Sequence, residues 1–223
     1  MAKYLTLLFT LITLNLFSQI ISNNIILLDK VDKSDTIIKY QNLTVCYDTL
    51  KKESHWSSYF ICKHRLNGNI PRKSSFTADP NLPKKISANL CSFKELNYDI
   101  GHLTPAKDMS FSQKSMDECF YFTNVAPQYY YFNRSTWKSL ENYVRELSSQ
   151  NDTILISTGV IWSLNKTTTC SEFSIPIPDK FWKIIYIKKL KKFRYFLFPN
   201  QKCEKDFLLY EVDNKKLMSE IYR

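Results

Sequence analysis

The segment Asp99-Ile100-Gly101-His102-Leu103-Thr104-Pro105-Ala106 contains the residues on which both the predicted fold and the predicted function depend. Its histidine is one of only three in the chain, and Gly101 and Pro105 beside it favour a sharp change in chain direction. A histidine held in such a turn can act as a general base, because free imidazole titrates near neutral pH. Taken alone, the segment fits a structural histidine better than a catalytic one.

The other two histidines, His55 and His64, lie among lysine, arginine and serine residues in sequence typical of strand edges or loops. Polar and charged neighbours favour an exposed imidazole. We therefore expect both to be solvated surface side chains.

Residues 133–146 are predicted to form an amphipathic helix. The segment lacks proline and glycine, and its apolar residues, including Trp137 and Leu140, recur at helical spacing. Asn133 and Glu141 lie at the edges of the same face, so two polar side chains border the apolar stripe. The pattern places Trp137 and Leu140 in the core rather than against a ligand.

The remaining chain predicts one α+β domain, residues 23–223, dominated by antiparallel sheet. Residues 71–83 contain three prolines and are typical of a surface loop, whereas residues 23–40 fit no element clearly. Runs of β-branched and aromatic residues predict strands at 43–47, 56–62, 153–158, 181–190 and 193–198.

The composition narrows the possible functions. Only three glycines are present, and neither a phosphate-binding P-loop nor a dinucleotide fingerprint occurs. The formal net charge of +10 favours a polyanionic partner such as nucleic acid, an anionic membrane or a glycosaminoglycan. Charge alone does not choose among these three.

Residues 1–22 are predicted to be a signal peptide, because Lys3 precedes an uncharged apolar run at residues 4–17. An uncleaved signal anchor is the alternative. We expect a secreted, extracellular protein with no stable membrane association after signal cleavage. Six cysteines in an exported chain also predict disulfide bonds, whose pairing the sequence does not give. The sequence contains no cysteine–histidine cluster of the kind that binds structural zinc.

The order of residues around and after His102 resembles the DNA/RNA non-specific endonuclease family, which includes endonuclease G-like and secreted bacterial nucleases. The family pattern is Asp-Arg-Gly-His-x-x-Pro-Ala, then Thr-Asn-x-x-Pro-Gln, then Asn, Trp, Leu and Glu at fixed intervals. The resemblance extends over about residues 45–212. The matching residues are Asp99, Gly101, His102, Pro105, Ala106, Thr123, Asn124, Pro127, Gln128, Asn133, Trp137, Leu140 and Glu141.

This resemblance implies the ββα-metal (His-Me finger) nuclease fold, with a central, mainly antiparallel sheet flanked by helices. It implies that His102 deprotonates the water that attacks phosphorus. Asn133 would be the one direct protein ligand of Mg²⁺, for which Mn²⁺ is a possible substitute. Glu141 would act from outside the ligand set by orienting water near the ion. The implied substrates are DNA and RNA, and a homodimer is possible because family members are often dimers.

Two further residues receive roles by the same resemblance. Arg145 occupies the position of a family arginine near the phosphate, although its spacing from Glu141 also fits an ion pair along one helix face. Asp99 is expected to orient the hairpin or the surroundings of His102 rather than to bind metal. We therefore include both among the candidate catalytic residues.

The chain departs from the family pattern at Ile100, where the family usually has arginine. The missing cation would lie near the scissile phosphate, and Lys107 is a candidate to replace it. For a second family arginine, upstream, the candidates are Arg72 and Lys73, but Ser74 is an alternative for the aligned position, so the sequence assigns none of them.

The leading hypothesis is a metal-dependent endonuclease that cleaves DNA and RNA with little sequence preference. The alternative is a catalytically weakened nuclease-like module that binds nucleic acid or another polyanion. A basic protein that binds membranes or glycosaminoglycans would explain the charge but not the ordered motif.

Overall fold

The computed structural model describes residues 20–22, 25–29, 31–163, 168–169 and 174–222. Most of the predicted signal peptide and Cys170 lie outside these residues. Within the described part of the chain, no helix combines the length and apolar character needed to cross a bilayer.

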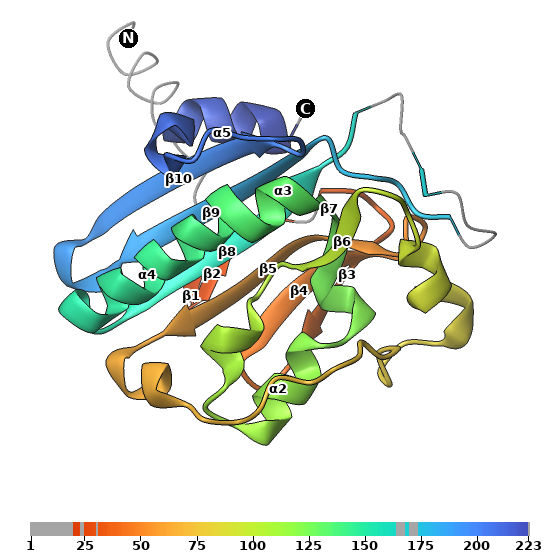
Figure 1. Ribbon diagram of the computed structural model, residues 1–223, viewed down its shortest axis with the longest axis horizontal. Helices are drawn as coiled ribbons and strands as arrows, with labels where there is room; N and C mark the ends of the chain where they lie inside the picture. The colour runs from red at the N-terminus through yellow and green to blue at the C-terminus, as the bar shows by residue number, and fades with distance from the viewer. Residues whose placement is uncertain (1–19, 23–24, 30, 164–167, 170–173, 223) are drawn as a thin grey trace, which may run out of the picture.

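A seven-stranded sheet organises the domain, in the order β11-β10-β9-β8-β5-β4-β3 with every neighbouring pair antiparallel (Figure 1). Its strands are β3 (Asp35–Lys39), β4 (Leu43–Asp48), β5 (Glu53–Ile61), β8 (Ile154–Ile161), β9 (Lys180–Ile187), β10 (Lys192–Pro199) and β11 (Glu211–Val212). The short strands β1 (Ile20–Ser22) and β2 (Ile25–Leu27) form a separate antiparallel pair. The predicted α+β fold with a mainly antiparallel sheet is confirmed.

Helices pack against both faces of this sheet. The helices are α2 (Gln113–Cys119), α3 (Tyr130–Phe132), α4 (Lys138–Asn151) and α5 (Asn214–Ile221), with a π-helical segment at Asn133–Trp137. Short 3₁₀ turns occur at Lys63–Asn67, Lys84–Ile86, Leu90–Phe93, Ala106–Met109, Phe122–Asn124, Lys188–Leu190 and Phe207–Tyr210. The turn at residues 188–190 ends the predicted strand 181–190 early, because Lys191 adopts a left-handed φ of 49°.

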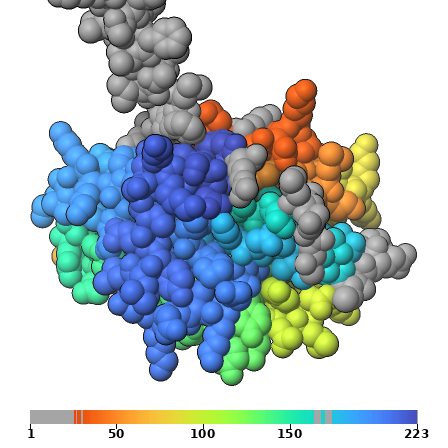
Figure 2. All heavy atoms as spheres, turned by 90° about the horizontal axis from the view of Figure 1, so that it is seen from above, coloured from red at the N-terminus to blue at the C-terminus, as the bar shows by residue number. Residues whose placement is uncertain are grey.

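Each face of the sheet has its own hydrophobic core. On one face, Trp137 and Leu140 are fully buried among residues such as Phe181, as the apolar stripe predicts. On the other, Leu217 of α5 packs in a cluster that includes Trp56. Figure 2 shows α5 and its neighbours, in dark blue, covering that second side. The two cores allow different chemistry on the two faces of the same sheet.

A hairpin outside the main sheet carries the central motif. Its strands are β6 (Tyr98–His102) and β7 (Val125–Tyr129), paired antiparallel so that His102 lies opposite Val125. The expected sharp turn at Gly101 is wrong, because this residue lies inside β6 and no glycine in the described chain has a positive φ. A Cβ at Gly101 would instead lie 2.3 Å from Oε1 of Gln128, so glycine is required by close packing.

The expected surface position of His55 is also wrong. A β-bulge in the β4–β5 ladder shifts the register, so that Cys46 pairs with Trp56 but Tyr47 pairs with Ser54. Such a bulge re-aims the side chains next to it. His55 is 5% exposed and faces a group of aspartates, whereas His64 is exposed as predicted.

The predicted disulfides are not formed among four of the described cysteines. Cys62, Cys91, Cys119 and Cys203 are free thiols. Burial raises the pKa of the Cys119 thiol to about 12, so this residue is inert near neutral pH.

We expect Gly159→Ala to destabilise the fold by about 1–3 kcal/mol, the usual cost of overpacking. A Cβ there would lie 2.2 Å from the carbonyl oxygen of His55 and 2.3 Å from the Trp182 ring. Urea unfolding would measure the loss. Lys215→Ala, on the exposed side of α5, is the control, and equal stability of the two variants would contradict this account.

Candidate active site

His102 is the last residue of β6, and the side chain of Asn124 fixes the backbone that follows it. Asn124 Oδ1 accepts from the amide of Thr104 at 3.0 Å, and its Nδ2 donates to the Thr104 carbonyl at 2.9 Å. The amide of Leu103 donates to the Asn124 carbonyl at 2.8 Å. Because Asn124 is fully buried, these bonds hold the exit from His102 in one conformation.

The imidazole of His102 lies between two aromatic rings at the edge of the core. The ring centroids of Phe76 and Phe120 are each 4.8 Å from that of His102. Its Nε2 is buried and has no hydrogen-bond partner in the protein. Burial, and then the positive charge of Arg72, lowers the pKa of His102 to about 3. The imidazole is therefore neutral at physiological pH and can accept a proton.

Asp99, three residues earlier in β6, connects the hairpin to the helix. Its Oδ2 accepts from Nδ2 of Asn133 at 2.9 Å and from Nε of Arg134 at 2.9 Å. The first bond orients the amide of Asn133, so that its Oδ1 is turned away from Asp99. Asp99 therefore lies where it can position the amide of Asn133.

Asn133 opens a π-helical segment that runs to Trp137 within an otherwise α-helical stretch. Single π turns inside α-helices often occur at functional sites, because they shift the side chains that precede them relative to those that follow. The sequence spacing predicted a regular helix here, since a π turn leaves no signature in apolar periodicity.

Glu141 is half-buried like Asn133, lines the cavity described below, and lies in a network of charged groups. Burial raises the pKa of Glu141 to about 7, although the nearby Lys183 opposes this shift. Burial likewise lowers the pKa of Lys183 to about 8, opposed by Glu141. The two groups are therefore a buried acid–base pair whose charges depend on each other.

Lys183 is a site residue whose role the sequence analysis missed. It is fully buried in β9, where Nζ donates to Oγ1 of Thr158 at 2.6 Å and lies 4.5 Å from the centroid of the Trp137 ring. A buried lysine needs such partners to remain charged. The available signal was a single lysine inside the apolar run Phe181–Ile187.

Arg145 forms its ion pair with Asp108, a second residue that the sequence analysis missed. Its Nη1 donates to Asp108 Oδ1 at 2.8 Å, and the hydroxyl of Tyr59 donates to Oδ2 at 2.9 Å. Because Asp108 is buried, this pair is rigid and holds the guanidinium beside Glu141. The i,i+4 pair with Glu141, considered as the alternative, is not among the ion pairs of the described residues.

Four of the five predicted site residues, all but Asp99, line one cavity of about 480 Å³ with a strongly basic rim. Of the upstream candidates, Arg72 lines the cavity, whereas Lys73 pairs with Asp117 at 3.0 Å. Ile100 also lines it. The lining residues are Arg72, Ile100, His102, Pro105, Ala106, Lys107, Asn133, Arg134, Lys138, Glu141, Asn142 and Arg145.

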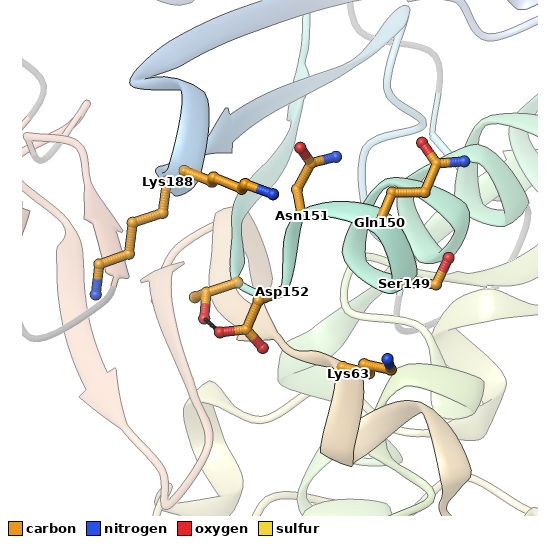
Figure 3. A pocket seen from close by; sticks show the side chains of 8 residues that line it. Lys63, Ser149, Gln150, Asn151, Asp152 and Lys188 are labelled. Carbon is orange, nitrogen blue, oxygen red and sulfur yellow. Dashed lines mark hydrogen bonds between the residues drawn. The ribbon is translucent and has the colours of Figure 1, made fainter.

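A second hollow, at the C-terminal end of α4, contains none of the predicted site residues (Figure 3). Its walls are the end of α4 together with Lys63 and Lys188, and the Thr153 hydroxyl donates to Asp152 at 3.3 Å. No histidine or buried carboxylate lines it. Of these two hollows, only the His102 cavity contains residues of the predicted catalytic motif.

Comparison with known proteins agrees with this geometry. A sequence model of the family described as DNA/RNA non-specific endonuclease matches residues 22–219. The chain belongs to the DNA/RNA non-specific endonuclease family. The fold is also that of a chain in the crystal structure of the EndoG/EndoGI complex, with a TM-score of 0.76, 21% identity and 83% of each chain covered. The family resemblance and the predicted ββα-metal fold are confirmed.

Curated relatives include "Nuclease 1, mitochondrial" from Schizosaccharomyces pombe, 31% identical over 64% of this chain and 48% of the relative. "Nuclease EXOG, mitochondrial" from Homo sapiens is 29% identical over 67% of this chain and 44% of its own length. "Endonuclease G, mitochondrial" from Homo sapiens is 26% identical, with 72% and 58% covered. The chain spans about half the length of these relatives.

The names of these relatives contradict the secreted, extracellular localisation that the N-terminus predicted. All three are mitochondrial nucleases, and they point to that compartment instead. The prediction of secretion depended on the apolar residues 4–17, which lie outside the nuclease domain and do not bear on its chemistry.

We expect Glu141→Gln to stabilise the metal-free protein at pH 8, by on the order of 1–3 kcal/mol. The pKa of Glu141 is raised to about 7 in the folded protein, so the fold favours the protonated carboxyl. The stabilisation from this protonated form is complete below the unfolded-state pKa of Glu141 and is lost as pH rises through 7. Denaturant unfolding at pH 5 and pH 8 would measure it. Glu146→Gln, exposed on the same helix, is the control, and an advantage equally large at pH 5 would refute the assignment.

Proposed function

We propose that this chain is a metal-dependent endonuclease that hydrolyses phosphodiester bonds in DNA and RNA with little sequence preference. The observation that carries the proposal is a buried, neutral His102 with an unpartnered Nε2, a residue that lines the same basic cavity as Asn133. A polyanion-binding module without catalysis would need the basic rim but not this imidazole. Family membership supports the enzyme reading.

The oxygen donors of the cavity suit Mg²⁺, with Mn²⁺ as a possible substitute. Asn133 Oδ1 is free of the Asp99 hydrogen bond and would be the direct ligand. Hard oxygen ligands, few in number, match the preference of Mg²⁺ for keeping its waters. The ion would supply Lewis-acid stabilisation of the charge that develops on the phosphate and on the leaving oxygen.

His102 would take the proton of the attacking water on Nε2. Burial keeps the imidazole neutral before the reaction, and the anionic substrate would stabilise the imidazolium that forms. Phe76 and Phe120 hold the ring in place, so little reorganisation is needed.

The cations of the rim would bind the phosphate and neighbouring backbone. Arg145, held by Asp108, is a fixed charge, whereas Arg72 stands over the Phe120 ring at 5.1 Å and is more exposed. Lys107 would replace part of the charge that Ile100 lacks. Glu141 would orient water near the ion from behind Asn133.

We expect His102→Ala and Asn133→Ala each to reduce plasmid cleavage in Mg²⁺ by at least about 100-fold. Purified full-length chain, with plasmid DNA and a structured RNA as substrates, would provide the measurement. His64→Ala, an exposed histidine, should cleave like the unaltered chain. Cleavage that survives His102→Ala would refute the assigned base, and a wild-type chain inactive in Mg²⁺ and Mn²⁺ would refute the enzyme.

We expect Arg72→Ala to slow cleavage by roughly 10- to 100-fold, because a cation near the phosphate stabilises the transition state. Lys73→Ala, one residue away but paired with Asp117, is the matched control. Single-turnover rates would separate binding from chemistry. If the two variants lost cleavage activity equally, the rate would depend on the total charge of this loop, and the specific role of Arg72 would be contradicted.

A further inference from the structure

A second cluster of ionisable side chains lies at the ends of β3, β4 and β5. Asp48 ends β4, Asp35 begins β3, and Asp32 precedes β3. His55 reaches the same place from β5 because of the bulge described above. Asp35 and Asp48 are buried, whereas the side chain of Asp32 is 49% exposed. None of these residues lines the His102 cavity.

The Nε2 atom of His55 points among three carboxylates rather than at one of them. It lies 3.2 Å from Oδ1 of Asp35 and 3.6 Å from Oδ2 of both Asp32 and Asp48. Although His55 is 5% exposed, Nε2 has no hydrogen-bond partner. A buried imidazole nitrogen aimed between several oxygens, rather than at one, is arranged as a ligand would be.

The distances fit a small cation with nitrogen and oxygen ligands. In a tetrahedral zinc site with bonds of about 2.0–2.2 Å, neighbouring ligand atoms are about 3.3–3.6 Å apart. The 3.6 Å distances from His55 Nε2 to Asp32 and Asp48 lie within this range, and the 3.2 Å distance to Asp35 is just below it. The ligand atoms of Asp32, Asp48 and His55 all lie within 4.8 Å of one another, so a small contraction would close the set.

The charge of the cluster also favours a cation. Among the described residues, the carboxylates of Asp32 and Asp48 share one ammonium, that of Lys51, which donates to Oδ2 of Asp32 at 2.6 Å and also to Oδ2 of Asp48. Those are the two oxygens that face His55. Two carboxylates that share a single ammonium in a partly buried place offer their remaining negative charge to a cation.

We propose that Asp32, Asp48 and His55, with Asp35 adjacent, form a binding site for a borderline divalent cation such as Zn²⁺. The ion would displace the Lys51 ammonium, whose flexible side chain can move toward solvent. A histidine ligand disfavours Mg²⁺ and Ca²⁺, which prefer oxygen alone. The site is independent of the proposed nuclease chemistry.

The cluster is accessible from outside. His55, Asp32 and Lys51 border a cavity of about 840 Å³, whose other walls include Trp162 and, from α5, Tyr222. Trp162 packs edge-on against His55 with ring centroids 4.9 Å apart and is itself held by Glu53 at 3.1 Å. A hydrated ion can therefore enter, while the inner wall holds the imidazole in position.

The test is Zn²⁺ titration of the full chain carrying His102→Ala and Asn133→Ala, which removes the main donors of the catalytic cavity. We expect one saturable site by calorimetry and a rise in the thermal unfolding midpoint, because the ion joins β3 and β4 to β5. Mg²⁺ and Ca²⁺ should produce neither effect at equal concentration.

The variants locate the site. In the same background, Asp32→Ala, a half-exposed position that the fold tolerates, should weaken Zn²⁺ binding at least tenfold, and His55→Ala should abolish it. His64→Ala is the matched control and should bind normally. Lys51→Met should bind more tightly, because the competing ammonium is gone.

Two results would overturn the proposal. One is the absence of saturable Zn²⁺ binding. The other is binding of equal affinity in the Asp32→Ala variant, because that result would assign the ion to free cysteines or another surface group. The Asp32→Ala result stands even if His55→Ala fails to fold.

Discussion

The hydrogen bonds of the Asp99 carboxylate fix the relation between the two halves of the candidate active site. His102 lies on a hairpin strand and Asn133 begins a helical segment, about thirty residues later in the chain. Asp99 sits on the same strand as His102 and accepts from both Asn133 and Arg134. Since the Arg134 side chain is 68% exposed, that ion pair adds little stability. The bond to Asn133 matters more, because it orients the amide oxygen.

Near the contact between Asp99 and Asn133, the protein keeps charged groups where apolar ones would give a more stable fold. They form a network between α4 and the sheet that consists of Glu141, Lys183, Asp108 and Arg145. Replacing a buried ionic network by apolar residues often stabilises a protein, so stability alone does not explain its presence. A fixed set of charges would prepare the cavity for the proposed phosphate and cation before either binds. The shifted pKa values of Glu141 and Lys183 are the cost of that preparation.

The sequence was sufficient for the scaffold and for the residues of the motif. Apolar periodicity located the strands and the buried face with Trp137 and Leu140, since burial in two layers imposes those periods. It could not locate Lys183 or Asp108, because their roles come from residues far away in the chain. His55 was misplaced for a local reason: one β-bulge reverses the side to which a strand residue points.

The same bulge divides β5 between the two faces of the sheet. Ser54 donates to the Thr123 carbonyl at 2.6 Å and Ser57 shares a hydrogen bond with the Thr104 hydroxyl at 2.7 Å, both on the side of the hairpin. His55, between them, faces the aspartate cluster on the other side. Thr104 lies two residues after His102 and is clamped by Asn124. Any interaction that fixes β5 through His55 therefore also fixes a strand on which the backbone after His102 rests. The ligands proposed on the two faces differ in kind: oxygen donors for a hard ion beside Asn133, and an imidazole with carboxylates for a softer one.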